Sequence, residues 1–242
     1  MNSSPMTEDY LKTLYAAEER GEDGLGVTDL ARAMGVVAST ASENVRKLQQ
    51  QGLVSHAPYQ RAHLTESGRR AAIMIIRRHR ILETYLYSRL GYDWDEVHRE
   101  AEVLEHAVSD KLLARMSAAL GHPTRDPHGD PIPPVEGGGG ALSRRSLSEV
   151  AVGEEAVVER ISDADPALLR YLDSLGVVLD AHLAIVERAD FAGTTTVQVT
   201  PPADWEPRQR DSLQPGVGPG QQQEFALGDR AVEAIWVSAD PG

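Results

Sequence analysis

The spacing of apolar residues over the first 65 positions predicts three short helices and a hairpin. The segment YLKTLY, residues 10–15, places apolar side chains three and four positions apart, on one face of a helix. Residues 28–34 and 39–51 predict two further helices on either side of Gly35, where a sharp turn requires a positive φ. Two β-like runs, LVSH and AHLT, follow them. This order predicts a helix-turn-helix followed by a β wing.

The periodicity lengthens after residue 65 and changes again after residue 147. Helical spacing predicts helices over residues 66–89, 95–106 and 109–120, and the Pro/Gly-rich segment 122–140 is typical of a linker. Beyond residue 147, short runs such as EAVVERI and HLAIVERA predict a small barrel. The predicted fold class is mainly α with a small β domain. Its domains are expected at residues 1–72, 73–136 and 147–242, with a Gly-rich linker at 137–146.

Composition excludes several classes of protein. The chain has 242 residues and no cysteine, so a disulfide framework, a zinc ribbon and a thiolate-held cluster are all excluded. No basic start precedes an apolar run and no apolar stretch approaches 20 residues, so neither a signal peptide nor a membrane span is expected. A cytoplasmic location is the resulting expectation. Any metal bound here must be held by nitrogen and oxygen.

Charge is distributed unevenly along the chain. The net charge is -13, which taken whole argues against nucleic-acid binding. Residues 1–80, however, carry 11 Lys/Arg against 9 Asp/Glu, whereas the remainder carries 13 against 28. A slightly basic start joined to an acidic body is compatible with a DNA-binding head on a second, acidic part.

A cluster of histidines and carboxylates is the strongest chemical signal. In HREAEVLEH, the side chains of His98, Glu102, Glu105 and His106 share one face of a helix, and His79 and Glu83 are four positions apart on the preceding helix. Buried together, they would repel one another unless a cation neutralised them, and such a donor set suits Mn(II) or Fe(II). The alternative is that these residues form ordinary solvated charged faces.

The chain resembles a known family of regulators. The order of helix, helix-turn-helix and wing, followed by RRHRILETYLYSRLGYDWDEVHREAEVLEHAVSD and later by HGDPIP, resembles the diphtheria-toxin-repressor/manganese-transport-regulator family. From residue 147 onward the chain is similar, more loosely, to the SH3-like (FeoA-type) barrel of the three-domain members. The resemblance implies a winged helix-turn-helix, a helical metal-binding and dimerisation domain, and a homodimer that binds double-stranded, palindromic operator DNA.

The resemblance also implies a primary regulatory metal site, at Asp9, Glu102, Glu105 and His106. By spacing alone, Asp9 is only a carboxylate near a helix N-terminus. Iron-sensing relatives carry Met and Cys at the positions of Asp9 and Glu102, whereas manganese-sensing relatives carry Asp and Glu. One departure is Lys12, which stands where the small two-domain manganese regulators have a bridging Glu. This lysine argues against a binuclear site and for two separate sites.

A second, ancillary site would use His79, Glu83 and His98, completed by a ligand from the barrel. Asp163 is the expected fourth ligand and Asp165 the alternative. His128, in the predicted linker, is expected to have no partner. Mn(II) is the expected ion, Fe(II) is possible, and other divalent metals are expected to substitute in vitro.

The predicted DNA contacts lie on and near the second helix of the helix-turn-helix and on the wing. Small polar side chains there can reach phosphates or base edges, and basic ones can reach phosphates, although each is equally compatible with a solvated helix residue. The candidates are Ser39, Thr40, Ser42, Glu43, Asn44, Arg46, Lys47 and Arg61.

The sequence therefore predicts a manganese-activated transcriptional repressor of metal-homeostasis genes. An iron(II)-responsive repressor of the same family is the first alternative. A metal-dependent hydrolase is the second, but no nucleophile–base pair or phosphate-binding loop supports it, and no catalytic residue is expected. A regulator that senses an organic ligand through the barrel is the third, and it leaves the carboxylates and histidines unexplained. No organic substrate and no membrane partner are expected.

Overall fold

The computed structural model describes residues 4–57, 59–135, 145–205 and 220–239. The chain forms two compact units, each built from several segments. The first contains Met1–Leu82, Glu102–Thr124 and Pro131–Gly140, and the second contains Glu83–Ala101, Arg125–Asp130 and Ala141–Gly242. None of the helices in the described part of the chain is long and apolar enough to cross a membrane.

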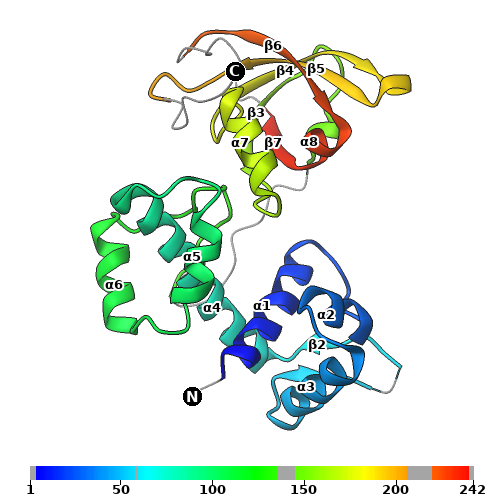
Figure 1. Ribbon diagram of the computed structural model, residues 1–242, viewed down its shortest axis with the longest axis vertical. Coiled ribbons are helices and arrows are strands. Elements are labelled where there is room, and N and C mark those ends of the chain that lie inside the picture. The colour runs from blue at the N-terminus through cyan, green and yellow to red at the C-terminus, as the bar shows by residue number, and fades with distance from the viewer. Residues whose placement is uncertain (1–3, 58, 136–144, 206–219, 240–242) are drawn as a thin grey trace. The chain divides into compact units, whose positions relative to one another are not determined.

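The first unit begins with the predicted winged helix-turn-helix, which the structure confirms (Figure 1). Gly35 has a φ of +62° in the turn, as expected. The two wing strands pair antiparallel, with Val54 opposite Leu64. The elements are α1 (Pro5–Glu19), α2 (Val27–Ala33), α3 (Ala38–Gln50), β1 (Val54–Ser55) and β2 (His63–Leu64).

A single apolar core joins α1 to the helix-turn-helix. On α1, Tyr10, Leu11 and Leu14 are each at most 1% exposed. They belong to one cluster with Val45 and Leu48 of α3 and with apolar residues from the start of α4. Burial of each such side chain contributes about 1.5–3 kcal/mol, so α1 is held firmly to the recognition helix α3.

The helical region contains three α-helices, as predicted, but their lengths differ. The predicted helix 66–89 is α4 (Glu66–Tyr85) followed by a π-helical turn, η1 (Leu86–Leu90), which ends at Gly91 with a φ of +73°. The predicted helix 95–106 is shorter, because α5 spans Val97–Leu104. Ser109 caps α6 (Asp110–Ala119), since its hydroxyl accepts a hydrogen bond from the N–H of Leu112 at 3.2 Å.

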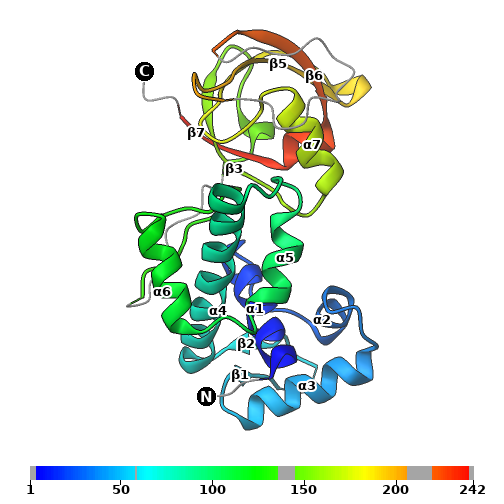
Figure 2. The same ribbon diagram turned by 60° about the vertical axis from the view of Figure 1, so that its left-hand side comes forward.

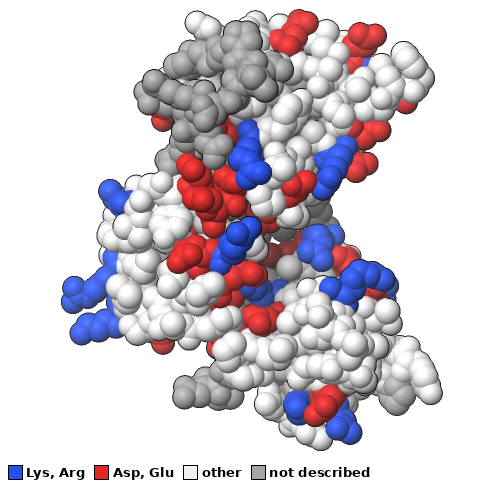
Figure 3. All heavy atoms as spheres, viewed as in Figure 1, with Lys and Arg blue, Asp and Glu red and all other residues white. Residues whose placement is uncertain are grey.

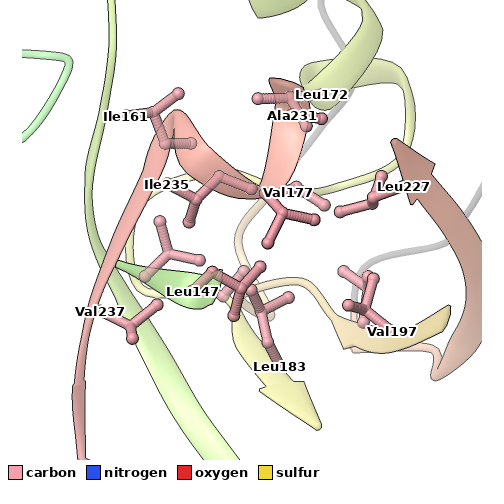
Figure 4. Close-up of a cluster of buried hydrophobic side chains, with 14 of the residues drawn as sticks. Leu147, Ile161, Leu172, Val177, Leu183, Val197, Leu227, Ala231, Ile235 and Val237 are labelled. Atoms are coloured by element: carbon pink, nitrogen blue, oxygen red, sulfur yellow. The ribbon is translucent and has the colours of Figure 1, made fainter. Parts of the chain in front are cut away.

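The second unit is built on a five-stranded antiparallel sheet, which curves as Figure 2 shows. The strand order is β6-β5-β4-β3-β7. Alternate residues of the strands point into an apolar core that includes Leu172 of α7 and Ala231 of α8 (Figure 4). This confirms the predicted C-terminal β domain. Its elements are η2 (Leu147–Glu149), β3 (Glu155–Ile161), α7 (Pro166–Ser174), β4 (His182–Ala189), η3 (Asp190–Ala192), β5 (Thr194–Thr200), β6 (Gln223–Gly228), α8 (Asp229–Glu233) and β7 (Ile235–Ala239).

Part of the Pro/Gly-rich segment is folded against β3 within the second unit. The N–H of Ile161 donates to the carbonyl of His128 at 2.9 Å. Asp126 accepts hydrogen bonds through Oδ1 from the N–H groups of His128 and Asp130, both at 2.9 Å. Gly129 lies so close to β3 that a Cβ would stand 2.0 Å from the carbonyl oxygen of Glu159. Residues 125–130 therefore form a strap with a defined conformation.

We expect Gly129→Ala to destabilise the second unit by about 3 kcal/mol or more, because it combines a φ of +95° with a backbone clash. Gly153→Ala is the matched control. Its φ is +83° but its Cβ would meet nothing within 4 Å, so it should cost only about 1–3 kcal/mol. Thermal or urea unfolding of the two variants measures the difference, and equal stabilities would contradict the close approach of the strap.

Candidate metal centre

Within the first unit, three of the predicted ligands form a compact group. Asp9 lies on α1, and Glu105 and His106 lie directly after α5. The Nε2 of His106 is 3.2 Å from Oδ1 of Asp9 and 3.7 Å from Oε1 of Glu105. One possible ligand atom from each of the three residues lies within 4.8 Å of the other two. Two carboxylates and an imidazole this close together are a suitable donor set for a hard divalent cation.

The ring of His106 is oriented by a residue that sequence reasoning did not single out. Its Nδ1 is 2.8 Å from Oε2 of Glu8, which is the residue before Asp9 on α1. A carboxylate on one imidazole nitrogen fixes the ring and directs the other nitrogen, here Nε2, toward the group. The dipeptide Glu8-Asp9 was the available signal, because two adjacent carboxylates can serve the two nitrogens of one ring.

Glu105 is the most deeply buried member of this group, with its side chain 0% exposed. Its Oε1 accepts a hydrogen bond from Nζ of Lys12 at 2.6 Å, and its Oε2 lies 2.5 Å from Nδ1 of His79. Burial alone would raise the pKa of Glu105, but His79 and Lys12 outweigh it and lower the pKa. Glu105 is therefore an anion inside the protein, neutralised by two donors.

Asp9 and Glu102 have different surroundings. Burial is the largest influence on Asp9 and raises the pKa of its carboxyl group, which indicates that this carboxylate lacks full compensation for its lost water. The side chain of Glu102 is 51% exposed, and its Oε1 lies 3.4 Å from Nζ of Lys12. Glu102 therefore lies at the rim, outside the group of three formed by the other predicted ligands.

In the second unit, His98 lies between two carboxylates. Its Nδ1 is 3.1 Å from Oε1 of Glu83 and 3.0 Å from Oδ2 of Asp163. Burial would lower the pKa of His98, but its hydrogen bonds to Asp163 and Glu83 outweigh this and raise the pKa to about 10. Asp165, the alternative ligand, instead caps α7 and pairs with Arg230 at 2.6 Å. His79, which the sequence assigned to this ancillary set, contacts Glu105 in the first unit.

Two further residues of the strap extend this second cluster. Glu83, Asp126 and His128 are all buried and offer ligand atoms within 4.8 Å of one another. His128 is 0% exposed, stacks on Trp94 with ring centroids 5.7 Å apart, and donates from Nε2 to the Trp94 carbonyl at 3.0 Å. The expectation that His128 has no partner was therefore wrong. The reason is that the segment taken for a linker is folded onto β3.

The other ring nitrogen of His128 gives a test of whether a cation fits the second cluster. In the neutral ring, Nε2 donates its proton to the Trp94 carbonyl and Nδ1 therefore carries the lone pair. This Nδ1 is buried and has no hydrogen-bond partner among the described residues. A buried lone pair beside carboxylates lacks a donor, and a cation would satisfy it. The segment DPHGDPIP contains the signal, because it places His128 two residues after the buried Asp126.

The predicted DNA-contacting residues lie on an accessible surface of α3 and the wing. Asn44 is half-buried and donates to the Tyr10 hydroxyl at 3.5 Å, whereas the remaining seven are exposed. Glu43 pairs with Lys47 at 2.9 Å, and charges of both signs lie together on the surface formed by α3 in Figure 3. Arg61 donates to the carbonyl of Gly24 at 2.9 Å. The ion pair with Lys47 offsets the negative charge of Glu43, which would otherwise approach phosphates unfavourably.

A winged helix with an exposed polar recognition helix, joined to clusters of carboxylates and imidazoles, defines a metal-responsive DNA-binding protein. Three family models match the chain. Residues 3–62 match the iron-dependent repressor N-terminal DNA-binding domain, residues 65–134 the iron-dependent repressor metal-binding and dimerisation domain, and residues 145–239 the FeoA domain. The chain belongs to the iron-dependent repressor family, which includes the diphtheria toxin repressor.

Individual proteins and solved structures that are similar to this chain agree with the family assignment. The iron-dependent repressor IdeR of Mycobacterium tuberculosis is 33% identical over 203 residues, which cover 79% of this chain and 87% of the relative. A solved structure of a manganese-dependent transcriptional repressor in complex with manganese is 47% identical, with a TM-score of 0.82, and covers 96% of this chain and 99% of that one. The manganese regulator SloR is 30% identical, with a TM-score of 0.72 and coverage of 98% and 100%.

The family assignment decides between the broad classes of function. The chain is a metal-dependent transcriptional repressor and not an enzyme, so the hydrolase alternative is excluded. The histidines and carboxylates of the two clusters are accordingly not interpreted as catalytic groups.

The surroundings of His98 predict how the stability of the metal-free protein depends on pH. The folded-state pKa, about 10, lies above the ordinary value of 6.5. The protonated ring therefore stabilises the fold fully below about pH 6.5, and this contribution is lost as the pH rises through about 10. With a chelator present, we expect the melting temperature to fall between pH 7 and 10 more steeply for the wild type than for His98→Gln. His182→Gln, at an exposed site on β4, should follow the wild type, and identical slopes for all three proteins would contradict the interpretation.

Proposed function

We propose that the chain is a manganese-activated repressor that binds palindromic operator DNA as a homodimer and controls genes of metal homeostasis. The observation that carries this proposal is the group in the first unit. There, Asp9 from the first helix of the DNA-binding part meets His106 from the end of α5 at 3.2 Å. A cation held by both would connect the DNA-binding part to the metal-binding and dimerisation domain.

The donor atoms favour manganese over a softer ion. The chain has no cysteine. By the family resemblance, Asp9 and Glu102 stand where iron-sensing members carry Met and Cys. Mn(II) forms the weakest complexes of the divalent first-row ions and needs hard oxygen donors. The 47% identical relative described as manganese-dependent supports this choice. An iron(II)-responsive repressor is the second candidate, which the 33% identity to an iron-dependent repressor favours.

Two separate sets of ligands are proposed. The primary set is Asp9, Glu105 and His106, with Glu102 close enough at the rim to join. The ancillary set is Glu83, His98 and Asp163, extended by Asp126 and His128. His79 stays a predicted member of the ancillary set by the family resemblance, and its Nδ1 also lies 2.5 Å from Oε2 of Glu105. A bound divalent ion would supply the positive charge that these buried carboxylates otherwise obtain from neighbouring side chains.

The route from the primary site to DNA passes through α1. Tyr10 and Leu14 of this helix pack in the same core as Val45 and Leu48 of α3. Fixing Asp9 relative to His106 therefore fixes the recognition helix as well. An ion that binds one arrangement of α1 more tightly shifts the population toward it, by no more than the difference in affinity.

Pairing of two chains follows from the matched dimerisation domain. Two apolar side chains in this region are exposed in the single chain, Val103 at 67% and Leu112 at 50%, and are available to a partner. A symmetric dimer presents two recognition helices related by a two-fold axis, and such dimers bind palindromes.

We expect Asp9→Ala to abolish activation by Mn(II). The loss of one carboxylate should weaken Mn(II) binding at the primary site by about 100-fold. Titration calorimetry of the metal-free chain measures this affinity, and selection from random DNA with and without Mn(II), followed by gel shift, measures operator binding. Asp23→Ala is the control, because the side chain of Asp23 is exposed, pairs with His63 and is not one of the proposed ligands. Unchanged manganese activation in Asp9→Ala would contradict the proposed coupling.

The same titration distinguishes manganese from iron. It is performed anaerobically with Mn(II) and with Fe(II). For each ion, the free concentration that activates DNA binding by the wild type is divided by the concentration available in the cell. We expect this ratio to be lower for Mn(II) than for Fe(II). Activation by Fe(II) alone would favour the second candidate.

For the ancillary set, we expect Asp163→Asn to reduce the stoichiometry from two Mn(II) ions per chain to one. Asp165→Asn is a matched control two positions away, because Asn preserves the cap of α7. Calorimetry and metal analysis after gel filtration measure the stoichiometry. Loss of an ion in Asp165→Asn but not in Asp163→Asn would reverse the assignment.

A further inference from the structure

Lys12 places its ammonium group among the proposed primary ligands. Its Nζ lies 2.6 Å from Oε1 of Glu105 and 3.4 Å from Oε1 of Glu102, and its side chain is only 16% exposed. Asp9 and Lys12 are three residues apart on α1 and therefore project from the same face of the helix. The helix that brings a carboxylate to the cluster thus also brings a positive charge.

The oxygen that Lys12 holds is the one that an ion would need. Of the two carboxylate oxygens of Glu105, Oε2 is engaged by His79. Oε1 is 3.7 Å from Nε2 of His106, which in turn lies 3.2 Å from Asp9. Oε1 therefore faces the rest of the ligand group, and Lys12 occupies it. A cation shared by these three residues would have to share Oε1 with the ammonium group, and the two positive charges would then lie a few ångströms apart.

The ammonium group of Lys12 compensates the buried negative charge of Glu105. A carboxylate that is fully buried is strongly destabilising without a positive partner. In the absence of metal, the ammonium group supplies that partner. Once a divalent cation is present, the same ammonium becomes a like charge a few ångströms away, and repulsion in a partly buried site is much stronger than in water.

We propose that Lys12 is an internal counter-cation of the metal-free site, which a divalent ion must displace from Glu105, so that this lysine sets the metal concentration to which the repressor responds. The inference rests on the proposed function, because it assumes that Asp9, Glu105 and His106 hold the ion. Lys12 is neither a ligand nor a catalytic residue. It determines the affinity of the site by competing for one oxygen.

The first test compares Lys12→Met, which keeps the length of the side chain but removes the charge, with Lys12→Arg, which keeps the charge. Calorimetric titration of the full metal-free chain with MnCl2 should show primary-site binding at least about tenfold tighter in Lys12→Met than in the wild type. The melting temperature in a chelator should fall by about 3–8 °C, because Glu105 loses the charged one of its two partners and keeps only His79, whereas that of the manganese-loaded protein should change little. Lys12→Arg should remain close to the wild type in both measurements.

The second test needs no substitution and therefore does not depend on the folding of a variant. The sequence contains three lysines, and Lys47 and Lys111 are both exposed. Reductive methylation followed by mass spectrometry should modify Lys12 slowly in the metal-free wild type and faster when Mn(II) is added. The other two lysines serve as internal controls, and their rates should not change.

The outcomes separate this inference from the proposed function. If the wild type binds no Mn(II), the proposed function fails. If the wild type binds Mn(II) but Lys12→Met binds it with equal or lower affinity, the inference is wrong and the lysine merely positions Glu105. Methylation of Lys12 that does not change on addition of Mn(II) would also overturn it.

Discussion

The first cluster depends on one constraint, which is that the carboxylate of Glu105 is removed from water and must be neutralised. Such a group is tolerated only when charged or strongly polar partners replace its hydration. Here Lys12 comes from α1 and His79 from α4, whereas Glu105 itself follows α5. Because these residues are distant in sequence, a single buried charge joins three separate segments of the first unit. Replacing the positive group beside Glu105 would therefore alter contacts made by all three segments.

The helix α1 contributes one face to the core of the winged helix and the other face to the first cluster. Its apolar face, with Tyr10, Leu11 and Leu14, belongs to the core of the winged helix. Its polar face carries Glu8, Asp9 and Lys12 into the cluster. A continuous helix of 15 residues cannot move one face without the other. A change at the cluster that moves α1 would therefore also move the residues that α1 packs against in the winged helix.

Much of this organisation could be predicted from the sequence, because it depends on local periodicity. The helix-turn-helix, the wing and the C-terminal strands follow from apolar spacing, and the shared face of His98 and Glu102 follows from 3.6 residues per turn. Glu105 and His106, predicted on the same face, instead lie beyond α5, which ends at Leu104. What could not be predicted depends on contacts between distant segments. His79 pairs with Glu105, and Glu8 orients His106. The strap of residues 125–130 is held where the N–H of Ile161, at the end of β3, donates to the carbonyl of His128. Neither periodicity nor composition predicts these contacts between distant residues.

The two clusters solve the same electrostatic problem in different ways. In the first, the buried carboxylate is neutralised by Lys12, whose pKa is raised because Glu105 and Glu102 outweigh the effect of burial. In the second, Glu83 and Asp163 hold a proton on His98. An ion entering the second cluster would thus exchange with a proton, and its affinity would depend on pH. An ion entering the first would exchange with a whole side chain that keeps its charge. If Lys12 is displaced as proposed, the affinity of the first cluster for an ion would depend on where that side chain can move.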